Sequence, residues 1–314
     1  MAELRLLLLT GLLLLLSACA GQSTYMPSQA DLDQLPSNTY IEQVHFYAQD
    51  DYQCGPASLA MLLSQRGFSD TPESLKDRVY LPQRLGSLQV EMVAAAREHG
   101  LLVYPLEHTL LALLREVAAG NAVLVMQNLG FNWMPQWHYA VVVGYDLNTQ
   151  EIILHSGTNK AQREPFNLFM RLWNRTERWA VIALPADQLP AKAEPLVYLR
   201  AASDLEQSRQ LDAAKRAYTT ALHAWPDQAA ARLGLGNVAW AQNQPEHAVA
   251  QFRALVSDFP TLKAGWNNLA VALAAVGCTQ AVRQAEACAN GTQAQTASAL
   301  PQADPPSCAI PACP

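Results

Sequence analysis

A cysteine at the start of a predicted helix is the residue of this sequence best suited to nucleophilic chemistry. Cys54 is followed by Gly55 and Pro56, and the spacing of the apolar residues after them predicts a helix over residues 54–65. Unsatisfied amides at a helix N-terminus carry partial positive charge, which lowers the pKa of a nearby thiol and raises its thiolate fraction. Gly55 allows a substrate to approach closely, and Pro56 suits a first turn where no amide donor is needed. Cys54 is therefore the candidate nucleophile.

Such a thiol needs a base, and seven histidines are available. His138 opens an apolar run over residues 139–145 that predicts a strand, so its ring would be held in place at a strand end. Four others lie near charged helix ends, where we expect solvent, or in the C-terminal helical repeat: His99, His108, His223 and His247. We therefore take His138 as the candidate general base.

The order of these residues resembles a known family. Gln49 precedes Cys54-Gly55-Pro56-Ala57, and Trp137-His138-Tyr139-Ala140 follows with its histidine 84 residues after the cysteine. Over residues 40–186 the sequence resembles the bacteriocin-processing, double-glycine leader peptidases, a group of papain-like cysteine proteases. It is most similar to the stand-alone lipoprotein branch of that group, which joins such a domain to tetratricopeptide repeats.

The resemblance implies a catalytic role for three residues. Cys54 would be the nucleophile, His138 the base and then the acid, and Gln49 a side-chain donor to the oxyanion. These roles cohere chemically, because thiolate attack creates an oxyanion that the Gln49 amide and the Cys54 backbone N–H can stabilise. Gln53 is an alternative donor, although a residue adjacent to the nucleophile is expected to point elsewhere.

The sequence departs from the family at the residue that orients the histidine. The family places an Asp on the next strand, commonly followed by Pro, whereas this sequence has Ser156 and then glycine. Asp146 would lie some 26 Å along the strand from His138, at about 3.3 Å per residue, and is expected to be a turn residue. Ser156 or Asn159 could hold the imidazole by a neutral hydrogen bond. The domain is then either a cysteine peptidase or a catalytically inactive scaffold that binds peptides.

Around these residues the sequence predicts an α+β, papain-like domain over residues 40–186, with helices in its first half and a largely antiparallel sheet in its second. We expect a first strand over 41–47, a helix over 87–96 capped by Ser87, and a helix over 110–119. Further strands are predicted over 122–126, 138–145, 152–155 and 179–184, with a short helical segment over 166–173.

A second, all-α domain is predicted over residues 194–290. Pro226 and Pro260 lie 34 residues apart, and the same offset pairs Tyr218 with Phe252. This is the period of tetratricopeptide repeats, in which small residues let paired helices approach and Pro ends the second helix. Two units fit residues 195–228 and 229–262, and a partial third unit over 263–290 loses the pattern in its second helix.

Four cysteines near the C-terminus suggest disulfide bonds in an exported protein. Cys278 and Cys288 lie about 15 Å apart along the expected final helix, which is too far for one bridge. Each would therefore pair with Cys308 or Cys313, which would fasten the Pro-rich tail over residues 291–314 onto the repeats.

Residues 1–18 are typical of an export signal. Their apolar stretch over 6–16 is too short to span a bilayer core of about 30 Å. Residues 16–19 resemble a lipoprotein lipobox, in which Cys19 is acylated; an ordinary cleaved signal is the alternative. Ala20 stands where Asp would signal inner-membrane retention, which implies anchoring to the outer membrane of a bacterial envelope, facing the periplasm. Residues 19–39 are polar and predict a tether.

Composition excludes several classes of function. The 314 residues carry 21 Lys+Arg against 27 Asp+Glu, a net charge of −6, which argues against binding nucleic acid. Motifs for metal ions or nucleotides, such as His-Glu-x-x-His or a Gly-rich phosphate loop, do not occur in the sequence, so we expect neither metal nor cofactor. The expected partners are a protein or peptide substrate, a protein bound by the repeats, and a membrane.

Overall fold

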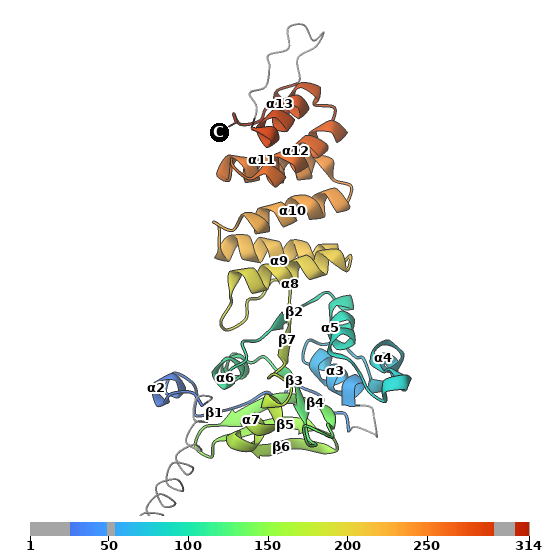
Figure 1. Cartoon of the computed structure of the whole chain (residues 1–314), viewed down its shortest axis with the longest axis vertical. Coiled ribbons are helices and arrows are strands. Elements are labelled where there is room, and N and C mark those ends of the chain that lie inside the picture. Colours follow the sequence, from blue (N-terminus) through green and yellow to red (C-terminus); the bar gives the residue numbers. More distant parts are fainter. Residues whose placement is uncertain (1–25, 49–53, 292–304, 314) are drawn as a thin grey trace, which may run out of the picture. The chain divides into compact units, whose positions relative to one another are not determined.

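The computed structural model describes residues 26–48, 54–291 and 305–313 (Figure 1). The chain divides into two compact units that interleave along the sequence. The first comprises residues 1–65, 69–72 and 105–182, and the second comprises residues 66–68, 73–104 and 183–314. Cys19, Gln49 and Gln53 lie outside the described residues.

A largely antiparallel sheet is the framework of the N-terminal half of the chain. Its strand order is β2-β7-β3-β4-β5-β6, and β1 pairs with β4 beside this path. The strands are β1 (Asn38–Tyr40), β2 (Leu101–Pro105), β3 (Val123–Asn128), β4 (Trp137–Asp146), β5 (Glu151–Ser156), β6 (Asn159–Pro165) and β7 (Ala180–Pro185). The pairs of β4 with β1, β3 and β5 are all antiparallel, as the sequence predicted for this part of the sheet.

β4 is the central strand, and its composition explains why. Every residue from Tyr139 to Tyr145 is buried, so both faces of the strand are covered. Near-continuous apolar runs of β-branched residues are typical of strands buried on both faces. Helix α7 (Phe166–Asn174) covers part of the sheet and contributes the fully buried side chains of Phe169 and Trp173 (Figure 1).

Helix α3 (Cys54–Ser64) confirms the helix predicted after the candidate nucleophile. All residues from Gly55 to Leu63 are buried, which makes α3 a core helix rather than an amphipathic surface helix. The Ser58 hydroxyl donates a hydrogen bond to the Tyr139 carbonyl at 3.1 Å and ties the first turns of α3 to β4. Helix α6 (Leu110–Ala118), capped by Thr109, confirms the helix predicted over 110–119.

The predicted strand over 41–47 is wrong. The strand lies just before it, at β1, and residues 41–48 have no regular secondary structure. Ile41 and Val44 are nevertheless buried, so the apolar pattern reflects burial of an irregular segment. Part of the predicted tether over 19–39 is also folded, since it contains the short helix α2 (Gln29–Leu32) and most of β1.

The second unit includes segments that precede the repeats in sequence. They are α4 (Pro72–Val79), the 3-10 turn η1 (Pro82–Arg84), α5 (Gln89–Glu98) and β2. Within this unit Arg97 of α5 forms an ion pair with Asp204. The cap of α5 is Leu88, which makes no side-chain cap hydrogen bond, so Ser87 is not the cap that the sequence predicted. No single residue near 190 therefore separates the two compact units.

Six helices form the repeats and stack on one another (Figure 1). They are α8 (Pro195–Gln207), α9 (Leu211–Ala224), α10 (Ala229–Ala241), α11 (Pro245–Asp258), α12 (Lys263–Ala275) and α13 (Thr279–Asn290). Gly234 lies against the ring of Tyr218, and Gly236 lies against the ring of Phe252. The third unit is complete because α13 forms, although its sequence loses the repeat pattern.

Two disulfide bonds fasten the tail to the last repeat, as the spacing predicted. Cys278 pairs with Cys308 and Cys288 pairs with Cys313, with Cα–Cα distances of 5.5 and 5.1 Å. Cys278, Cys288 and Cys308 are buried in the same apolar cluster as Trp266. The covalent links compensate for the weak repeat pattern of α13, since they hold the end of the chain against the last two helices.

Candidate active site

Cys54 occupies the first position of α3 and has a free thiol. It is half-buried, and burial raises the pKa of the thiol above its usual value of 9.0. Hydrogen bonds with the backbone of Tyr139 and Gly55 lower the pKa but do not outweigh burial. The sequence predicted a lowered thiol pKa at the helix N-terminus, but the pKa is raised. Desolvation destabilises the thiolate by more than the nearby backbone amides stabilise it.

His138 is the second residue of β4 and lies opposite Gln127 of β3. Burial lowers the pKa of its imidazole from 6.5 to about 4, so the ring is neutral at neutral pH. A neutral imidazole has one nitrogen free to accept a proton, which is the form that a general base requires.

Ser156 is the residue that the structure places behind His138. Its Oγ lies 2.9 Å from His138 Nε2, across the β4–β5 pair. Asn159, the other candidate, is exposed, and its Nδ2 donates to Gln162 Oε1 at 3.2 Å. Asp146 is the last residue of β4, at the opposite end from His138, and not the turn residue that the sequence predicted; its Oδ1 accepts a hydrogen bond from the Asn148 backbone N–H in the turn that follows.

The contacts of Tyr139 place Cys54 against the strand that carries His138. The Cys54 thiol is hydrogen bonded to the Tyr139 backbone, and Tyr139 directly follows His138. Because Ser156 engages Nε2, the nitrogen of His138 left to exchange a proton with the thiol is Nδ1. The geometry can therefore support acyl transfer through a thiol and an imidazole. Gln49, the candidate oxyanion donor, lies outside the described residues.

A second buried polar pair lies on the His138 face of the sheet, and the sequence reasoning missed it. Gln127 Nε2 donates to Glu164 Oε2 at 2.8 Å, and both side chains are buried. Burial raises the pKa of the Glu164 carboxyl. Gln127 was missed because the predicted strand ended at residue 126, and Glu164 because β6, whose residues are mostly polar, was not predicted.

His155 has a structural place rather than a catalytic one. It is fully buried, its Nδ1 accepts the Ala161 backbone N–H at 3.1 Å, and its ring packs edge-on against Phe46. It follows the strand alternation of β5, so it faces the opposite side of the sheet from Ser156 and His138. Among the described residues no three His, Cys, Asp or Glu side chains are grouped so that they could hold a metal ion.

Two protein-family models match parts of the chain. Residues 40–181 match the family model described as "Peptidase_C39 like family", and residues 199–263 match a tetratricopeptide repeat model. The chain carries a C39-like peptidase domain followed by tetratricopeptide repeats. The match of 40–181 contains Cys54, His138 and Ser156, so the residues gathered at the start of β4 belong to the peptidase-like part.

One solved structure is similar to part of the chain. It comes from Bacillus anthracis and is described as a C39-like peptidase; it shares 15% sequence identity, with a TM-score of 0.40. The match covers 48% of this chain and 98% of the other. None of the curated proteins in the comparison matches the chain. No helix among the described residues is long and apolar enough to cross a membrane.

Proposed function

We propose that the protein is a cysteine peptidase in which Cys54 is the nucleophile and His138 the general base. The observation that supports this most directly is the hydrogen bond between His138 and Ser156, together with the position of the Cys54 thiol against Tyr139. A base oriented by a polar group and a thiol at a helix start form the constellation expected for nucleophilic catalysis.

The proposed reaction starts from a neutral pair. The Cys54 sulfur attacks the carbonyl carbon of the scissile peptide bond while His138 Nδ1 takes the thiol proton. The Cys54 backbone N–H and the Gln49 amide stabilise the oxyanion. His138 then protonates the leaving amine, the C–N bond breaks, and a thioester remains on Cys54. His138 then takes a proton from water as the water oxygen attacks the thioester carbon. The tetrahedral intermediate collapses, the C–S bond breaks, the acid is released, and His138 returns its proton to the Cys54 sulfur.

Ser156 is proposed as the positioning residue. Its oxygen accepts a hydrogen bond from the Nε2–H group, which leaves Nδ1 with the lone pair that the reaction needs. A hydroxyl carries no charge, so it stabilises the imidazolium less than the Asp of the family would. We therefore expect an active but slow enzyme.

The test is hydrolysis of a peptide library by the wild type and by Cys54→Ala. We expect hydrolysis by the wild type to disappear in Cys54→Ala and in His138→Ala, while the control His247→Ala, an exposed residue of α11, keeps it. The same chains are treated with an iodoacetamide probe at mildly alkaline pH, where only Cys54→Ala should lose labelling. Equal hydrolysis and equal labelling of the wild type and Cys54→Ala would reject the proposal that the protein is a cysteine peptidase.

The other parts of the chain are proposed to anchor the peptidase domain to a membrane and to bring a protein to it. We expect Cys19 to carry a lipid that anchors the protein to the bacterial cell envelope, at the outer membrane and facing the periplasm. The repeats are expected to recruit a protein partner or the substrate itself, because stacked helix pairs present extended surfaces for protein binding. Mass spectrometry of the mature N-terminus checks the acylation.

An inactive peptide-binding scaffold is the second candidate. It is favoured by the electrostatics of the site, since burial keeps the Cys54 thiol protonated and lowers the pKa of His138 to about 4. If Cys54→Ala binds the library peptides as the wild type does and neither chain cleaves them, this second function replaces the first.

A further inference from the structure

The loop between β3 and β4 exposes a row of large apolar side chains. We call residues 129–137 the aromatic hairpin. Its exposed large apolar side chains are those of Leu129, Phe131, Trp133, Met134 and, at the first position of β4, Trp137. Trp133 is 78% exposed and Phe131 is 59% exposed. No residue of the aromatic hairpin is charged, and contiguous exposed apolar surface of this kind marks a contact with a protein or a membrane.

The aromatic hairpin is an ordered element. Phe131 and Met134 exchange two backbone hydrogen bonds of 3.1 Å at its tip. The rings of Phe131 and Trp133 stack with their centroids 5.7 Å apart. A Cβ atom at Gly130 would lie only 2.4 Å from the Met134 carbonyl oxygen. The close approach of the two sides of the aromatic hairpin therefore requires glycine at this position.

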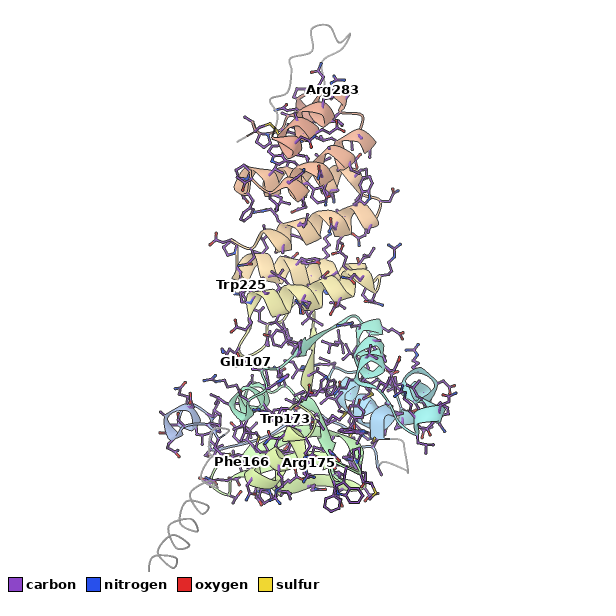
Figure 2. The ribbon with its side chains drawn as sticks, viewed as in Figure 1. Glu107, Phe166, Trp173, Arg175, Trp225 and Arg283 are labelled. Carbon is purple, nitrogen blue, oxygen red and sulfur yellow. A yellow bond between two sulfur atoms is a disulfide. The ribbon has the colours of Figure 1, made fainter. Side chains whose placement is uncertain are left out.

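Two side chains brace its base. Asn128 Oδ1 accepts the backbone N–H groups of Gly130 at 3.0 Å and Gln136 at 2.9 Å. Arg175, labelled in Figure 2, follows α7 and donates from Nη1 to the carbonyl oxygens of Asn128 and Gly130. The apolar side chains are therefore presented by a supported backbone.

We propose that the aromatic hairpin inserts into the interfacial layer of a phospholipid bilayer. Residues 131–137 are all exposed, so both sides of the ribbon project, whereas one wall of a peptide-binding cleft would expose a single side. Trp rings suit the bilayer interface because they combine a large apolar surface with a polar N–H. The lack of charge points to zwitterionic lipid and not to anionic headgroups.

This inference rests on the lipid anchor of the proposed function. Met26, the first described residue, lies seven positions after Cys19, and a chain of that length reaches at most about 25 Å. An acyl chain at Cys19 would therefore hold the folded chain close to a bilayer. His138 directly follows Trp137, so insertion of the hairpin brings the candidate base near the lipid surface, where polypeptide segments lying at that surface become its substrates.

The test uses tryptophan fluorescence of the full chain in phosphatidylcholine vesicles with brominated acyl chains. Bromine quenches only those indoles that lie within the bilayer, and residues 1–25 contain no tryptophan, so the anchor alone gives no quenching. We expect quenching in the wild type and none in the double variant Trp133→Phe, Trp137→Phe. The control Trp240→Phe removes an exposed tryptophan of α10 and should keep the quenching.

Flotation of the vesicles, measured on the same samples, separates the anchor from the hairpin. A wild type that floats with the vesicles without being quenched overturns the hairpin inference and leaves the anchor standing. A wild type that neither floats nor is quenched overturns both. The inference also fails if the double variant loses cleavage of soluble peptides while the wild type is not quenched, because the hairpin then binds polypeptide. Cys54→Ala should be quenched like the wild type, whatever its activity.

Discussion

At the scale of single residues, the site is governed by burial. Burial holds the Cys54 thiol and the His138 imidazole in their neutral forms, and the helix N-terminus does not reverse this. The orienting group, Ser156, is neutral as well. The resting site is therefore an uncharged pair, and in the proposed reaction charge separation arises only as the thiol attacks.

Replacing Ser156 should slow catalysis without weakening substrate binding. Loss of one hydrogen bond of about 1–1.5 kcal/mol predicts that kcat of Ser156→Ala falls roughly tenfold while KM changes little. The control is Asn159→Ala, which removes the other candidate and should leave both constants unchanged, since Asn159 is exposed and contacts Gln162. Steady-state kinetics on one peptide checks both variants; a slower Asn159→Ala would assign the orienting role to Asn159.

Alkylation of Cys54 should depend on pH in the manner of a buried thiol. Because burial raises the thiol pKa above 9.0, the thiolate fraction keeps growing as the pH rises through 9.0. The rate of iodoacetamide labelling should therefore rise over this range without levelling off near neutrality. A plateau of the rate below neutral pH would instead show a thiolate–imidazolium pair. The two disulfide bonds leave Cys54 as the one free thiol of the described residues.

At the scale of elements, β4 organises the site and small residues organise the repeats. β4 carries His138 at one end and contacts α3 through the Tyr139 backbone, so one strand sets the distance between base and nucleophile. In the repeats, glycines of α10 accept the rings of Tyr218 and Phe252 from the neighbouring helices. Helix pairs approach closely only because these positions lack a side chain.

Gly236→Ala should destabilise the repeats. A Cβ atom at Gly236 would lie 2.2 Å from the Phe252 ring, and overpacking of this kind costs about 1–3 kcal/mol. In an uncrowded helix, changing Gly to Ala increases the free energy of unfolding by about 1 kcal/mol. A decrease in this free energy would therefore show that the added methyl group meets the Phe252 ring. Urea denaturation followed by circular dichroism measures it. Gly86→Ala is the control, since its Cβ would meet nothing closer than 3.8 Å; a gain in stability for Gly236→Ala would contradict the packing.

At the scale of the whole molecule, the chain combines a C39-like peptidase domain with repeats closed by disulfide bonds. The proposed export of the chain would place these bonds in an oxidising compartment, where disulfide bonds persist. The repeats end in the covalently fastened tail, where the sequence pattern of the third unit is weakest.

Reduction of the disulfide bonds should lower the stability of the last repeat but leave the peptidase site working. Each bond is expected to contribute about 2–4 kcal/mol. Repeats are coupled chiefly to their neighbours, so the loss stays near α12 and α13. Thermal unfolding of the double variant Cys308→Ser, Cys313→Ser should begin at a lower temperature than in the wild type, with peptide hydrolysis unchanged. A parallel loss of hydrolysis would show that the tail supports the site.

The sequence by itself determined the features that depend on local pattern. Three such features are the start of α3 at Cys54, the strand that carries His138, and the 34-residue period of the repeats. They can be predicted because the spacing of apolar residues and the positions of turn residues reflect interactions between residues close together in the sequence. The disulfide framework was readable as a choice between two pairings, since distance along a helix excludes a bond between Cys278 and Cys288.

Only the tertiary structure decided which partners those residues meet. Whether Ser156 or Asn159 faces His138 depends on strand register and on the bulge between Leu154 and Ser156, and a shift of one residue turns a side chain to the other face. The pKa values of Cys54 and His138 depend on how much of the folded chain covers them. For Cys54, burial raises the pKa by more than the helix N-terminus lowers it. Register and burial arise from contacts between distant segments, and no local pattern encodes them.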